Sequence, residues 1–107
     1  MIYELREYYI APGKVETLHR MFREKLLEFF EKHDIKVVGY WNVKVGENPK
    51  LIYLCQFRDF KHFDEAWKSI RSDQEWIEAK KEYTKDGPLT IKTESTILTP
   101  TDYSPLK

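Results

Sequence analysis

The feature that most constrains this chain is the order in which its hydrophobic spacing changes. Residues 2 to 10 alternate β-forming side chains between two faces, which predicts a strand. Residues 14 to 33 repeat their apolar side chains at the spacing of an amphipathic helix. Residues 35 to 45 and 51 to 57 return to β-rich composition on either side of the turn sequence Gly46-Glu47-Asn48-Pro49. The first half of the chain therefore predicts a strand, a helix and a hairpin.

The second half predicts a broken helix and a last strand. Asp59 is suited to cap the start of a helix. The spacing of Ser72 and Glu75 is that of a capping box, so we expect a second helical segment to open at Ser72. Residues 89 to 99 alternate like a strand, and residues 100 to 107 form a tail that contains two prolines.

The resulting order, β-α-β-β-α-β, is that of a ferredoxin-like α+β fold. Right-handed crossovers then place both helices on one face of a four-stranded antiparallel sheet. A chain of 107 residues has room for this one domain, so we assign residues 1–107 to it. The other sheet face would be uncovered, yet both faces of the first two β-rich segments carry apolar side chains. Those side chains are Tyr3, Leu5, Tyr8, Ile10, Val37, Val38, Tyr40 and Trp41. A second copy of the chain is the natural cover, which predicts a homodimer through the open sheet face.

Composition excludes several partners. Lys plus Arg and Asp plus Glu both number 18, so no net positive field would attract nucleic acid or an anionic membrane. No run of 18 apolar residues could span a bilayer, and charges interrupt the N-terminal segment. The single cysteine permits no intrachain disulfide, and we expect a cytoplasmic location. Three scattered histidines have no metal-ligand spacing, and nucleotide-binding motifs are missing. We therefore expect neither a metal nor a cofactor.

Glu4, Arg6 and Tyr8 form the main candidate site, because residues two apart on a strand share a face. We expect that face to be the uncovered one, which would carry both charges into the space between subunits. There, Arg6 could bind a carboxylate or phosphate and Glu4 could accept a proton. Alternatively, Glu4 and Arg6 neutralise each other as a structural ion pair. The sequence leaves both interpretations open.

Further residues could line the same pocket. Trp41 shares a face with Gly39. A glycine beside a large ring could leave room for a ligand, or the pair could simply pack in the interface. Tyr40, Tyr53 and Cys55 could also face a cavity, although a place in the core is the simpler interpretation of each. Cys55 has no basic residue close in sequence to lower its pKa, so we expect an inert buried thiol. The candidate pocket is thus Glu4, Arg6, Tyr8, Trp41, Tyr53 and Cys55.

Several motifs together resemble the NIPSNAP family. They are Tyr3-Glu4-Leu5-Arg6, Pro12-Gly13-Lys14, Val38-Gly39-Tyr40-Trp41, Gly46, Asp73 to Trp76, and Leu98-Thr99-Pro100-Thr101-Asp102-Tyr103-Ser104-Pro105. The resemblance implies a dimeric α/β barrel in which two ferredoxin-like sheets face each other and enclose a cavity. This chain has Cys55-Gln56-Phe57 where a Trp-x-Tyr pattern is common in the family, so its pocket would differ in shape and polarity.

Two functions are compatible with such a barrel, because the fold hosts many unrelated activities. The first is a dimeric protein without assignable catalysis that binds a small metabolite between the sheet faces. The second is a cofactor-independent monooxygenase, isomerase or cyclase that acts on a small hydrophobic or aromatic substrate. The enzyme would need an enclosed pocket of about 300 Å³ or more with converging polar groups.

Overall fold

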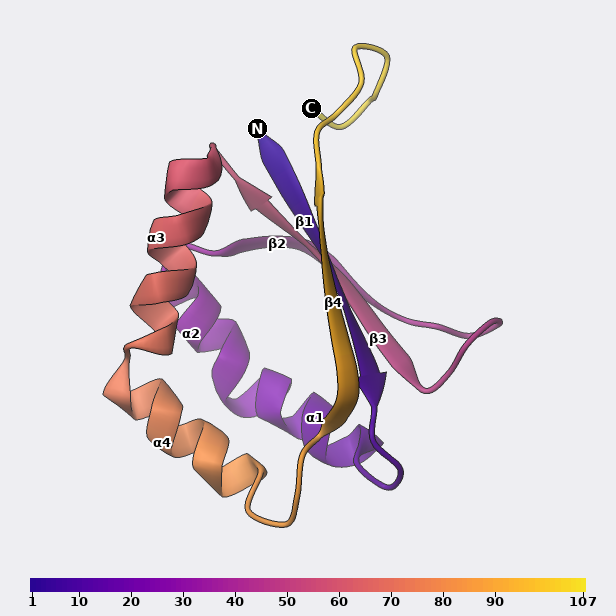
Figure 1. Ribbon diagram of the computed structural model, residues 1–107, viewed down its shortest axis with the longest axis vertical. Coiled ribbons are helices and arrows are strands. Elements are labelled where there is room, and N and C mark those ends of the chain that lie inside the picture. The colour runs from indigo at the N-terminus through magenta and orange to yellow at the C-terminus, as the bar shows by residue number, and fades with distance from the viewer.

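The computed structural model describes residues 1–107 and shows the predicted four-stranded antiparallel sheet. Its strands are β1 (Ile2–Ile10), β2 (Lys36–Asn42), β3 (Lys50–Phe57) and β4 (Thr90–Leu98), in the spatial order β2-β3-β1-β4. The first strand of the chain therefore lies inside the sheet, and β2 and β4 form the two edges. All helices lie on one side of the sheet (Figure 1). The predicted ferredoxin-like α+β fold is confirmed.

The first helical segment is continuous but irregular. It consists of α1 (Val15–Met21), the π-helical turn η1 (Phe22–Leu26) and α2 (Leu27–Lys32). The sequence predicted one regular helix over 14 to 33, and the π-helical turn was not foreseen. A π turn accommodates an extra residue, so the apolar stripe shifts around the helix and Leu27 is left 44% exposed.

None of the helices is both long enough and apolar enough to cross a lipid bilayer.

The second helical segment is broken as predicted, into α3 (Phe60–Arg71) and α4 (Gln74–Tyr83). Asp59 caps α3, since its carboxylate accepts a hydrogen bond from the His62 backbone N–H at 2.8 Å. The predicted capping box at Ser72 is wrong by one residue, because Asp73 caps α4. Ser72 instead continues the end of α3, where its hydroxyl donates to the Lys68 carbonyl at 2.8 Å and satisfies a terminal acceptor.

Asp73 also joins the two helical segments, which predicts a pH-dependent contribution to stability. Its carboxylate lies 3.0 Å from Lys32 Nζ and 2.6 Å from His33 Nε2, and these bonds lower the pKa of Asp73 to about 2. A carboxylate whose pKa is lowered on folding stabilises the fold above its ordinary pKa, and this contribution is lost as the pH falls toward the folded-state value.

We therefore expect Asp73→Asn, which keeps a capping side chain, to be less stable than the native protein at neutral pH. The difference should shrink as the pH falls from the ordinary pKa of 3.8 toward about 2. Thermal unfolding of both proteins across this range measures it. A difference that stays constant down to pH 2 would contradict the proposed ion pairs.

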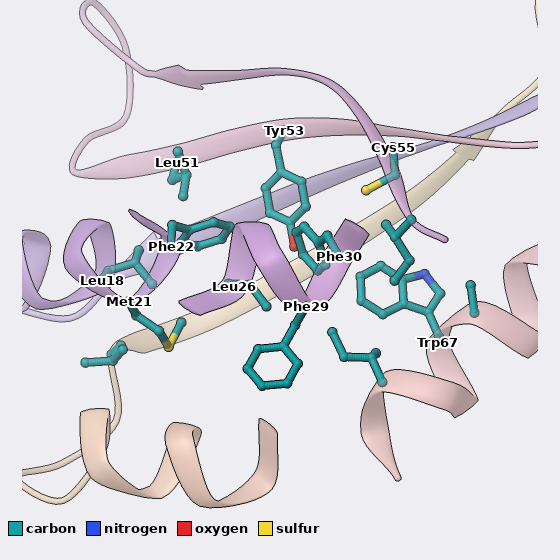
Figure 2. Close-up of a cluster of buried hydrophobic side chains, with 14 of the residues drawn as sticks. Leu18, Met21, Phe22, Leu26, Phe29, Phe30, Leu51, Tyr53, Cys55 and Trp67 are labelled. Atoms are coloured by element: carbon teal, nitrogen blue, oxygen red, sulfur yellow. The ribbon is translucent and has the colours of Figure 1, made fainter. Parts of the chain in front are cut away.

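The pleat of the sheet separates two sets of side chains. On β3, Leu51, Tyr53, Cys55 and Phe57 are buried against the helices. Figure 2 shows Tyr53 and Cys55 pointing from β3 toward side chains of the helices, among them Phe22, Phe30 and Trp67. The alternate residues point to the other side of the sheet, which no helix or strand covers. The C-terminal tail reaches this side at Tyr3, whose hydroxyl donates to the Lys107 carbonyl. This open face carries apolar side chains from all four strands: Leu5, Trp41, Ile52, Leu54 and Leu98.

Candidate functional site

Glu4, Arg6 and Tyr8 lie on the side of β1 that the helices cover. The indole Nε1 of Trp67, on α3, donates to Glu4 Oε1 at 2.8 Å, and the Tyr8 ring lies 6.1 Å from that of Phe22. Glu4 is only 1% exposed. The prediction that these three residues line the uncovered face is therefore wrong. Both alternating sets of β1 mix charged and apolar side chains, so the pattern alone did not reveal which set faces the core.

Four of the predicted residues, Glu4, Arg6 and Tyr8 on β1 and Tyr53 on β3, meet in one hydrogen-bonded network. Arg6 donates from Nη1 to Glu4 Oε2 at 2.9 Å, from Nε to the Tyr53 hydroxyl at 2.8 Å, and from Nη2 to the Tyr8 hydroxyl at 3.3 Å. The two phenol oxygens of Tyr8 and Tyr53 are 2.7 Å apart. Ser95, on the neighbouring strand β4, donates to Glu4 Oε2 at 2.5 Å. We call these five residues, together with Trp67, the Glu4–Arg6 network.

Electrostatics keep Arg6 charged and Tyr53 neutral within the Glu4–Arg6 network. Burial alone would lower the pKa of Arg6, but Tyr53, Tyr8 and Glu4 outweigh it and hold that pKa above its ordinary value. Burial also raises the pKa of Tyr53, which therefore remains a neutral phenol. The guanidinium carbon of Arg6 lies 4.5 Å from the centre of the Trp67 ring, a cation–π contact. The network leaves no buried side-chain polar atom without a partner.

Cys55 and Trp41 complete the predicted set but lie in different places. Cys55 pairs with Glu4 in the sheet register and is fully buried. Its burial, and to a smaller extent the charge of Glu4, raises the pKa of Cys55 to about 12. This environment agrees with an inert thiol. Trp41 is 52% exposed on the open face, where a Cβ at Gly39 would come within 2.7 Å of its ring. The predicted pocket residues thus do not surround one cavity.

An accessible concavity lies elsewhere, between the edge strand β2 and the first helical segment. Two hollows of about 380 and 200 Å³ adjoin there and share Leu27 and Tyr40. We call them together the Tyr40 groove. The larger is lined by Leu27, Phe30, Glu31, Asp34, Ile35, Lys36, Val37 and Tyr40, and the smaller by His19, Phe22, Arg23, Leu27, Tyr40, Trp41, Asn42 and Leu51.

Tyr40 is the polar centre of this groove. Its ring packs against Tyr53 and Phe22 with centroids 5.3 and 5.6 Å away, yet its side chain is 37% exposed and its hydroxyl bonds no atom of the chain. Burial raises the pKa of Tyr40, so the hydroxyl stays protonated and can donate. The sequence offered two signs of the groove. Tyr40 is one of the residues that could face a cavity, and Leu27 is a large apolar residue next to, but outside, the predicted helical stripe.

A comparison with family models identifies the chain's relatives. Residues 3–105 match the model of NIPSNAP. The chain belongs to the NIPSNAP family. This confirms the resemblance that the sequence motifs indicated, and the match extends over almost the whole domain. No curated protein matches the sequence significantly.

Solved structures agree with the assignment to NIPSNAP. A NIPSNAP family protein from Agrobacterium tumefaciens is 25% identical, with a TM-score of 0.89 over 99% of this chain and 98% of that one. An uncharacterised NIPSNAP domain protein from Burkholderia xenovorans is 21% identical, with a TM-score of 0.86 over 98% of this chain and 99% of that one. A monooxygenase from Streptomyces coelicolor, solved with the ligand nanaomycin D, shares the fold at a TM-score of 0.62 and 8% identity, over 96% of this chain and 89% of that one.

Proposed function

We propose that this NIPSNAP chain is a homodimer that binds a small organic molecule, and that its Glu4–Arg6 network supports the fold. The observation that carries the proposal is the contrast between two regions of the helix-covered side. In the network, Glu4 already accepts hydrogen bonds from Arg6, Trp67 and Ser95. In the Tyr40 groove, by contrast, the surface is hollowed, mostly apolar and has an unpaired hydroxyl, as ligand sites commonly do.

Binding is better supported than catalysis by the geometry of Glu4. A general base must reach the proton that it removes. Both oxygens of the Glu4 carboxylate are occupied by donors of its own chain, and the residue is almost completely buried. The likeness to a monooxygenase supports a shared fold, and a fold alone does not carry an activity. A metabolite-binding role requires no free base.

Dimerisation is supported by the open face of the sheet. Leu5, Ile52 and Leu54 are side by side at its centre, since Leu5 pairs with Leu54 in the register and Glu7 pairs with Ile52. Exposed apolar area costs roughly 25 cal/mol per Å² in water, so a second sheet packed on this face would be stabilising. Most of the lining of the Tyr40 groove lies on the helix side of the sheet, and only Trp41 also belongs to the open face, so pairing would leave most of the groove accessible.

The dimer is tested by a charge placed at the centre of the open face. We expect Leu54→Lys to convert the dimer to a monomer, because a buried unpaired ammonium is costly. Size-exclusion chromatography with light scattering measures the mass, and circular dichroism checks the fold. Val45→Lys is the matched control, since Val45 is 92% exposed outside the sheet and should leave the dimer intact. A native protein that is monomeric at micromolar concentration would contradict the proposal.

The binding role is tested by native mass spectrometry of protein purified from its own host. We expect an added mass on the dimer that is lost when the protein is denatured. Glu4→Gln offers a second check, because it removes the only acidic group of the network. If this variant abolishes retention of the added mass while the dimer persists, the network itself is the site and the structural interpretation of it is wrong.

A further inference from the structure

Both walls of the Tyr40 groove depart from regular backbone geometry. On the helix side, the π-helical turn Phe22–Leu26 leads into Leu27, which is exposed. On the strand side, the register of β2 against β3 shifts between Val37 and Gly39, as a β-bulge does. Such irregularities occur often beside functional sites, where they redirect side chains. Two of them on facing walls indicate that the groove has a role beyond packing.

The lining of the groove is mostly apolar. Phe22 and Phe30 are buried beneath it, and Leu27 is shared by both hollows. The larger hollow, about 380 Å³, is within the size range of small-molecule sites. Tyr40, which lines both hollows, offers a phenol ring together with the unpaired hydroxyl. These features favour an aromatic molecule over a sugar or a nucleotide, which would need many more polar partners.

Charge differs between the two ends of the groove. Arg23 and His19 line the smaller hollow, while Glu31 and Asp34 line the larger one with Lys36. Arg23 has only a loose partner, Glu16 at 3.4 Å, and both side chains are well exposed, so this pair contributes little. A carboxylate would therefore be attracted to the smaller hollow and repelled from the acidic side chains of the larger one.

We propose that the Tyr40 groove binds a small aromatic carboxylic acid, with its ring against Leu27 and Tyr40 and its carboxylate beside Arg23 and His19. The inference rests on the proposed binding function and names the ligand class and the place. Arg23 is suited to the role because a guanidinium can donate two parallel hydrogen bonds to a carboxylate.

The test compares an acid and a matching alcohol on the full-length protein. 2-Naphthoate and 2-naphthalenemethanol are titrated into ¹⁵N-labelled protein and followed by NMR. We expect shifts centred on Leu27 and Tyr40 for both, with the acid roughly two- to fivefold tighter, as an ion pair to an exposed arginine would give. Arg23→Gln should bring the acid to the affinity of the alcohol, and Leu27→Gln should weaken both. Arg20→Gln, an exposed arginine on the same helical segment, is the matched control and should change neither.

The outcomes separate this inference from the function on which it rests. Equal affinities of acid and alcohol, or shifts centred away from the groove, overturn the inference. So does a lack of binding by both probes at millimolar concentration. If the protein from its host still retains a ligand in that case, the binding function stands and only the ligand class or place is wrong. If it retains nothing, both proposals fail.

Discussion

Replacing Arg6 with alanine is expected to lower the free energy of unfolding by about 3–5 kcal/mol, the usual cost of removing one partner of a buried ion pair. The substitution leaves the Glu4 carboxylate, 1% exposed, without its cation. It also removes the donors that bind the Tyr8 and Tyr53 hydroxyls. Urea denaturation followed by tryptophan fluorescence measures the change. This decrease is a large part of the free energy of unfolding of a typical domain. An Arg6→Ala variant that is already unfolded at room temperature would therefore also support the prediction.

Arg71→Ala is the matched control for that experiment. Arg71 also lies over the Trp67 ring, at 5.7 Å, but it is exposed and forms no ion pair, so its loss should cost at most about 1 kcal/mol. Replacing both Glu4 and Arg6 with apolar residues of similar size should recover much of the stability, because no buried charge remains. If Arg6→Ala were as stable as the native protein, the network would have no structural role.

Replacing Phe22 with alanine is expected to cost a similar amount, about 3–5 kcal/mol, through the cavity that it leaves. Phe22 is 5% exposed and lies within 6.3 Å, between ring centroids, of Tyr8, Phe30, Tyr40 and Tyr53. Its loss removes contacts to all four rings at once. Chemical denaturation at several protein concentrations separates this effect from any change in dimerisation.

Phe60→Ala provides the same chemical change at a site that should tolerate it. Phe60 is 60% exposed at the start of α3, so its truncation should stay within about 0.5 kcal/mol. Similar losses for Phe22→Ala and Phe60→Ala would show that the aromatic cluster is not the energetic centre of the core.

The order of elements could be predicted because it depends on local signals. The alternation of residues 2 to 10 ends at Pro12-Gly13, and β1 has the predicted bounds. The cap at Asp59 and the break between α3 and α4 likewise follow from side chains within a few positions of each other. The cap predicted at Ser72 is wrong by one residue because Ser72 and Asp73 can both cap a helix. The contacts of Asp73 with Lys32 and His33 favour Asp73, and these contacts are not local in sequence.

The site depends on contacts that local patterns do not contain. Glu4 is held by Trp67 and Ser95, which are 63 and 91 positions away along the chain. An unpaired carboxylate would be costly on the covered face, but these distant donors make the burial of Glu4 tolerable. The Tyr40 groove was missed for a related reason. It lies beside the π-helical turn Phe22–Leu26, and such a turn has no reliable signature in composition.

The inside position of β1 has a consequence for how the chain acquires its structure during synthesis. β1 is translated first, but its neighbours are β3 and β4, and β4 is the last strand to leave the ribosome. Until then β1 has an unpaired side, and Glu4 lacks its bond from Ser95. Pairings between the two ends of a chain are slow to form because a long loop must close first. Completion of the sheet therefore waits for the synthesis of β4, which favours late assembly of the whole domain over stepwise growth from β1.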